Sequence, residues 1–70
     1  MQIALHNYYD FGQRKFYCCG HGFEGKMEYR SFYEVNERGE RIGDIFEREL
    51  PRLKELIVLG QITQSDRLRY

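Results

Sequence analysis

The sequence has no tryptophan, a single proline and no long hydrophobic run. Its longest aliphatic run is Leu56-Ile57-Val58-Leu59, whereas a membrane-spanning helix needs about 20 consecutive apolar residues. The first residues soon reach His6 and Asn7, which is not the pattern of a secretory signal peptide. These absences predict a cytoplasmic chain that makes no membrane contact.

An excess of charge of either sign is also lacking, because 11 Lys and Arg balance 11 Asp and Glu. Binding to nucleic acid is driven largely by neutralisation of phosphates and normally needs an excess of basic residues. Direct contact with nucleic acid is therefore expected to be less favoured than contact with protein. The composition, 41% hydrophobic and 31% charged, is that of a globular chain. Its 70 residues predict one compact domain over 1–70.

Apolar and polar residues in the first half alternate with a period of two, which predicts strands over about residues 2–43. The clearest alternation, over residues 26–35, places Met27 and Tyr33 on one face and Phe32 with charged residues on the other. Because the first face is the more apolar, we assign it to the core and Phe32 to the outside. The next residues, Asn36-Glu37-Arg38-Gly39, predict a hairpin turn with a left-handed glycine.

The second half changes to helical spacing of its apolar residues, which predicts a helix over about residues 45–59. Asp44 and Glu47 have the spacing of a capping box at its start. Pro51 would fall inside this helix, where a proline removes a hydrogen bond. We expect one helix kinked at Pro51, and the alternative is that the proline divides it into two.

The predicted architecture is an α+β domain, in which three to four antiparallel strands precede one C-terminal helix packed on one face of the sheet. The polar tail, residues 61–70, is expected to be an edge strand or extended chain. Successive strand residues point to opposite faces. The doublets Tyr8-Tyr9, Phe16-Tyr17 and Phe32-Tyr33 should therefore each place one ring on the face that the helix leaves uncovered.

This uncovered face is the predicted partner-binding site. Aromatic anchors inside a charged rim are typical of protein–protein hot spots. Two alternatives remain open: the rings simply stabilise cross-strand pairs, or the face forms a homodimer. The pattern also leaves open whether Phe16 or Tyr17 faces outward. The predicted contact residues are His6, Tyr8, Tyr17, Arg30, Phe32 and Glu34.

Cys18, Cys19 and His21 are the candidate residues for a zinc or thiol site. Adjacent cysteines diverge on a strand, and the two-residue gap that is usual between ligand cysteines is missing. A thiol nucleophile needs an oriented base, whereas the glycines around His21 predict mobility. We therefore expect no metal, no cofactor and no enzymatic activity, and keep a small zinc-binding or thiol protein as an alternative.

Binding to another protein is the function that these observations favour. In size and fold style the chain is similar to small inhibitors of CRISPR surveillance complexes made by phages and mobile elements, which implies inhibition of a larger host nucleoprotein complex. The other alternative is a nucleic-acid-binding domain that stacks bases on the aromatic face and holds phosphates with Arg30. The signature of the RNA-recognition module, a basic residue and glycine before alternating aromatics, is absent.

Overall fold

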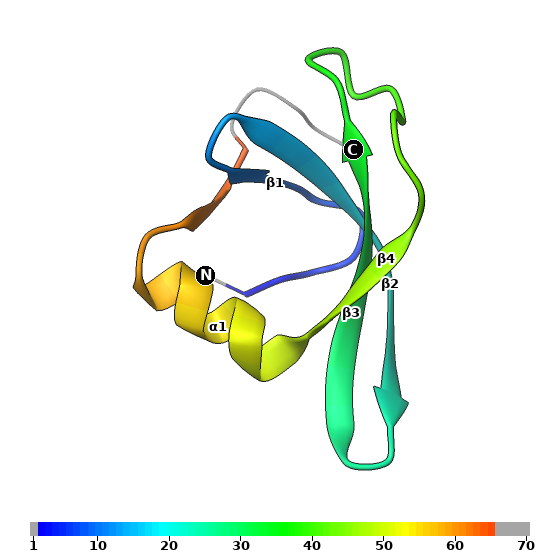
Figure 1. Ribbon diagram of the computed structural model, residues 1–70, viewed down its shortest axis with the longest axis vertical. Coiled ribbons are helices and arrows are strands. Elements are labelled where there is room, and N and C mark those ends of the chain that lie inside the picture. Colours follow the sequence, from blue (N-terminus) through cyan, green and yellow to red (C-terminus); the bar gives the residue numbers. More distant parts are fainter. Residues whose placement is uncertain (1, 66–70) are drawn as a thin grey trace.

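The computed structural model describes residues 2–65 and contains a five-stranded antiparallel sheet with one short helix (Figure 1). The elements are β1 (Tyr8–Phe11), β2 (Arg14–Glu24), β3 (Met27–Val35), β4 (Phe46–Glu49), α1 (Leu50–Val58) and β5 (Ile62–Gln64). The strand order in the sheet is β4-β3-β2-β1-β5. The α+β class is confirmed, but the sheet has five strands where three to four were predicted, and a strand follows the helix.

The helix begins later than predicted, at Leu50 instead of near residue 45. The residues before it form β4, which pairs with β3 along the edge of the sheet. The predicted capping box at Asp44 is therefore wrong, and the helix is instead preceded by Glu49, whose side chain makes no capping hydrogen bond. The predicted kink is also wrong, because Pro51 lies in the first helical turn. In that turn no backbone N–H has a helical partner, so a proline is tolerated.

Replacing Pro51 with alanine is expected to change the free energy of unfolding by less than about 1 kcal/mol. A proline in a helix interior costs about 3 kcal/mol, so alanine would restore a similar amount if Pro51 kinked the helix. Urea denaturation followed by far-ultraviolet circular dichroism measures this difference. A gain of roughly 3 kcal/mol would contradict the placement of Pro51 in the first turn.

The predicted hairpin turn after β3 is confirmed. The backbone N–H of Asn36 donates to the carbonyl of Glu40 at 2.8 Å, and Gly39 takes a left-handed φ of 83°. Strands were predicted as far as about residue 43, but residues 40–43 belong to none of the strands, and Arg41 forms an isolated bridge with Val35. Of the predicted polar tail, residues 62–64 form edge strand β5 and residues 66–70 lie outside the described part.

The core lies between α1, the N-terminal segment and one face of the sheet. Residues 2–7 are not the strand that the sequence predicted; they pack in the core through Ile3. Two side chains fix this segment: Tyr9 Oη accepts the N–H of Ala4 at 2.8 Å, and Arg30 Nε donates to the carbonyl of Ile3 at 3.0 Å. The buried core cluster comprises Ile3, Tyr9, Cys18, Phe32, Leu50, Leu53 and Ile62.

The face of β3 that packs against the core is the opposite of the predicted one. Phe32 is only 5% exposed and belongs to the core cluster beneath α1, whereas Tyr33 lies on the other face. Alternation shows which residues share a face but not which face the helix covers. Complete burial is more favourable in free energy for phenylalanine than for tyrosine, because tyrosine has a hydroxyl that needs water or a polar partner. Full burial of Phe32 is the physically favoured arrangement.

Helix α1 has nine residues, and the described part of the chain contains no helix long and apolar enough to cross a bilayer.

Candidate functional site

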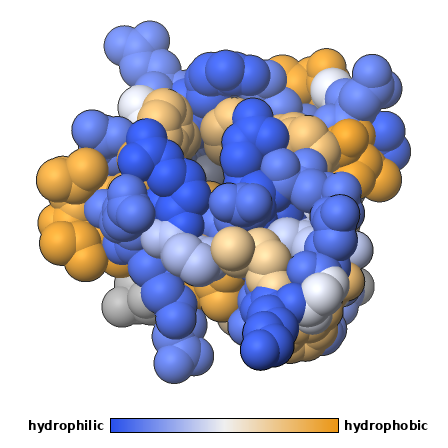
Figure 2. Space-filling model, turned by 60° about the horizontal axis from the view of Figure 1, so that its bottom comes forward, coloured by the Kyte–Doolittle hydropathy of each residue, from blue (hydrophilic) through white to orange (hydrophobic). Residues whose placement is uncertain are grey.

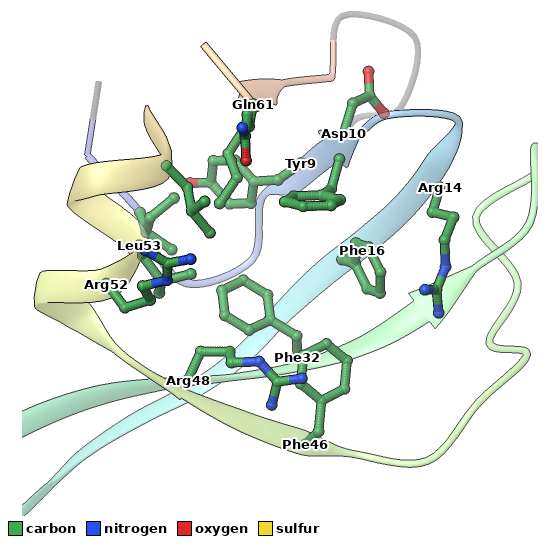
Figure 3. A pocket seen from close by; sticks show the side chains of 14 residues that line it. Tyr9, Asp10, Arg14, Phe16, Phe32, Phe46, Arg48, Arg52, Leu53 and Gln61 are labelled. Atoms are coloured by element: carbon green, nitrogen blue, oxygen red, sulfur yellow. The ribbon is translucent and has the colours of Figure 1, made fainter. Parts of the chain in front are cut away.

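A cleft of about 590 Å³ opens beside α1, on the face of the sheet that carries the helix. A nine-residue helix cannot cover five strands, so part of this face stays open. Figure 3 shows the result: aromatic rings rise from the strands toward the open space, with the helix on one side and arginine side chains around them. The cleft is thus a consequence of how short α1 is.

Four phenylalanines from four neighbouring strands line the cleft, and we call them the phenylalanine band: Phe11, Phe16, Phe32 and Phe46. Phe16 and Phe46 meet edge to face with ring centroids 5.5 Å apart, and Phe32 stacks on Phe46 at 5.9 Å. Both geometries are favourable for aromatic pairs. Phe32 is the most buried ring of the band at 5% exposure, and Phe11 is the most exposed at 42%. The band therefore joins the core to the solvent-facing part of the cleft.

Arg14 forms one rim of the cleft. Its guanidinium lies 5.2 Å from the ring centroid of Phe16 and donates two hydrogen bonds to the carboxylate of Glu34, at 2.8 and 3.1 Å. These hydrogen bonds lower the pKa of the Glu34 carboxyl and raise the pKa of Arg14. Both charges are therefore satisfied within the domain.

Arg48 and Arg52 reach the cleft from the corner where β4 runs into α1 (Figure 3). Arg48 lies 4.6 Å from the ring centroid of Phe46, and its Nη1 donates to the carbonyl of Glu47 at 2.8 Å. Within residues 2–65 it forms no ion pair with a carboxylate. Arg52 pairs with Glu55 at 3.0 Å, but both side chains are more than 60% exposed, so the pair contributes little.

Other exposed apolar side chains are spread over the molecule. The face in Figure 2 is mainly hydrophilic, and its apolar atoms form separate patches. Phe23 near the end of the β2–β3 hairpin is 65% exposed, and Val58 at the end of α1 is 86% exposed. Among the large exposed apolar side chains of residues 2–65, Phe11 is the one that lines the cleft.

The predicted partner-binding residues divide between the two faces of the sheet. His6, Tyr8 and Tyr17 lie on the face away from α1, where His6 Nδ1 is 2.7 Å from the Tyr17 hydroxyl. The Tyr8 and Tyr17 ring centroids are 5.0 Å apart, and Tyr33 continues the row at 5.2 Å from Tyr17. This settles the open question in β2: Tyr17 faces away from the helix and Phe16 toward it. Tyr17 is only 7% exposed, so the row packs as cross-strand pairs.

The other three predicted residues lie on the helix-bearing face. Arg30 is not a free contact residue, because it holds the N-terminal segment and its Nη1 pairs with Glu28 at 2.7 Å. Phe32 forms the floor of the cleft, and Glu34 binds the rim arginine. The six predicted residues therefore do not form one surface, which corrects the predicted site.

The candidate zinc and thiol residues are not gathered by the fold. Cys18 is fully buried in the core, and burial raises the pKa of its thiol, which opposes reactivity. Cys19 is half-buried at a register shift between Cys18 and Gly20. In the described residues, no three His, Cys, Asp or Glu side chains lie close enough together to hold a metal ion.

The cleft residues that the sequence analysis missed carry a recognisable signal. Arg14 and Phe16, and again Phe46 and Arg48, are separated by two positions. On a strand this spacing puts both side chains on one face, where a guanidinium can stack on a ring. The second pair does not follow from the predicted helix over about residues 45–59, because Phe46 and Arg48 share a face only when they lie on a strand.

Comparison with known proteins finds no matching family model, no matching curated protein and no matching solved structure. The chemistry of the cleft follows from its own side chains. Phenyl rings provide an apolar floor, and guanidinium groups provide hydrogen-bond donors with positive charge. This combination is chemically suited to apolar and anionic groups that lie side by side.

Proposed function

We propose that the protein is a non-catalytic module that binds a segment of a partner protein in the cleft beside α1. The observation that carries this proposal is the phenylalanine band, which leads from the core to a ring that is 42% exposed at Phe11. Aromatic anchors in an apolar recess with arginine at the rim match the composition of protein–protein hot spots. An apolar side chain of a partner would remove these rings from water.

Inhibition of a larger host complex is the role that we propose for this module. An inhibitor that covers a functional surface of a large machine needs a binding surface but no reacting groups. Size and fold style support this role by analogy with the small phage and mobile-element inhibitors of CRISPR complexes, and it would act in the cytoplasm. The zero net charge favours a protein subunit of the host complex over its nucleic acid.

Selection of random peptides displayed against the immobilised domain tests the binding function. Enriched peptides are expected to lose about tenfold or more in affinity for the variant Phe11→Ala, because the most exposed ring of the band is a natural hot-spot anchor. Phe23→Ala is the matched control, since Phe23 is exposed but lies outside the cleft. Failure to enrich any peptide, or enrichment that is equal on Phe11→Ala, would contradict the proposal.

A further inference from the structure

The charges that line the cleft are not balanced within it. Asp10 is the carboxylate in the described lining, and it pairs with Lys15 at 3.2 Å. Arg14 is neutralised by Glu34. The remaining lining charges are Arg48, which has no carboxylate partner within residues 2–65, and Arg52, whose partner is exposed. Among the side chains that line the cleft, an excess of positive charge therefore remains where β4 runs into α1, because Glu47 and Glu49 of β4 are not part of the lining.

The Arg48 guanidinium is oriented toward the cleft. Stacking on Phe46 favours one orientation of the guanidinium plane, and the solvent-exposed hydrogen bond from Nη1 to the Glu47 carbonyl favours the same placement. A guanidinium has five N–H donors in a rigid fork that matches a carboxylate, and within residues 2–65 the Arg48 guanidinium forms its hydrogen bond through Nη1. The other donors are available for a bidentate contact that loses little side-chain entropy.

We infer that the occupant of the cleft is an acidic segment of the partner protein. One apolar side chain of the segment packs on the phenylalanine band, and neighbouring Asp or Glu side chains pair with Arg48 and Arg52. A partner carboxylate replaces Glu55 on Arg52 at small cost, because an exposed ion pair contributes little. This inference rests on the proposed function and specifies the chemistry of its partner.

A protein carboxylate fits the cleft better than a nucleic-acid phosphate. Base stacking needs open ring faces, but Phe16 and Phe46 each carry a guanidinium over the ring, and Phe32 is buried. A base would have to displace these arginines. An aliphatic or aromatic side chain, by contrast, packs against Phe11 and the ring edges while both guanidinium groups stay in place.

The peptides selected on the domain test this inference. They are expected to be enriched in Asp and Glu beside an apolar residue. A synthetic copy of one enriched peptide should bind about tenfold more tightly than its copy with Asn and Gln replacing Asp and Glu, as charge-assisted hydrogen bonds to arginine require. Arg48→Gln should weaken binding of the acidic peptide about tenfold and leave the neutral peptide unchanged, which measures the coupling between the two groups.

Arg38→Gln is the matched control, because Arg38 has a side chain 82% exposed in the turn after β3 and does not line the cleft. Equal affinity of wild type and Arg48→Gln for the acidic peptide would overturn the inference, and so would selected peptides without an excess of Asp and Glu. If binding still depended on Phe11 in either case, the proposed function would stand. A mixed-sequence single-stranded oligonucleotide retained through Arg48 would overturn the inference in favour of nucleic acid.

Discussion

Phe32→Ala is expected to lower the free energy of unfolding by about 3–5 kcal/mol, the usual cost of removing a buried phenyl ring. Phe32 is 5% exposed, belongs to the core cluster and stacks on Phe46 at 5.9 Å. Small domains have total stabilities of about 5–15 kcal/mol, and one of 70 residues belongs at the lower end. A large fraction of the variant should therefore be unfolded, as urea denaturation followed by circular dichroism will measure.

Phe23→Ala provides the matched control for this experiment. Phe23 is 65% exposed on the β2–β3 hairpin, so the same chemical change should stay within about 0.5 kcal/mol of wild type. A stable Phe32→Ala variant with an unchanged denaturation midpoint would mean that Phe32 points outward, as the alternation in the sequence predicted. The core assignment would then be wrong.

Phe32 also shows which features of β3 can be predicted from the sequence and which cannot. The alternation over β3 correctly grouped Phe32 with Arg30 and Glu34 on one face, and the hairpin turn with its left-handed Gly39 was predicted from local chemistry. Tertiary packing decides which face the helix covers. A strand with aromatic residues on both faces gives no local signal for which face is buried. The choice of the more apolar face failed because tyrosine counts as apolar in a pattern but keeps a hydroxyl that needs a polar partner.

Strand β4 was missed for a different physical reason. Its four residues, Phe46–Glu49, are too few to distinguish a period of two from a helical period. Pairing with β3 decides the outcome, and that contact is not local. Pro51 was the available local signal, since a proline commonly occupies the first turn of a helix, and it would have placed the helix start within a residue or two.

The cleft results from the two features that the sequence did not predict, the short helix α1 and strand β4. It exists because α1 is short, and its arginine corner exists because Arg48 lies on a strand next to Phe46 and ahead of Arg52. A helix over residues 45–59 would have covered more of the sheet and turned these side chains elsewhere. The general prediction of an aromatic binding surface with charged neighbours survives as a proposal, but at the opposite face of the sheet.

The second large effect is expected at the N-terminal segment, where Ile3→Ala should cost about 2–5 kcal/mol. Ile3 is 4% exposed in the core cluster although residues 2–7 form no strand. The segment is held by backbone contacts as well, through the Ile3 carbonyl on Arg30 and the Ala4 N–H on Tyr9. These hydrogen bonds keep the backbone in place, so the cavity left by the missing side chain cannot close completely.

Ile42→Ala is the matched control, because Ile42 is 57% exposed in the loop before β4 and should change stability by no more than about 0.5 kcal/mol. Equal stability of the two variants would show that the N-terminal segment is an appendage to the domain. Ile3 also lines the cleft. If Ile3→Ala is less stable but still binds the selected peptides, the N-terminal segment contributes to folding and not to recognition. Weaker peptide binding by Ile3→Ala under conditions where circular dichroism shows the variant still folded, with binding retained in Ile42→Ala, would mean that Ile3 closes the core and also shapes one wall of the cleft.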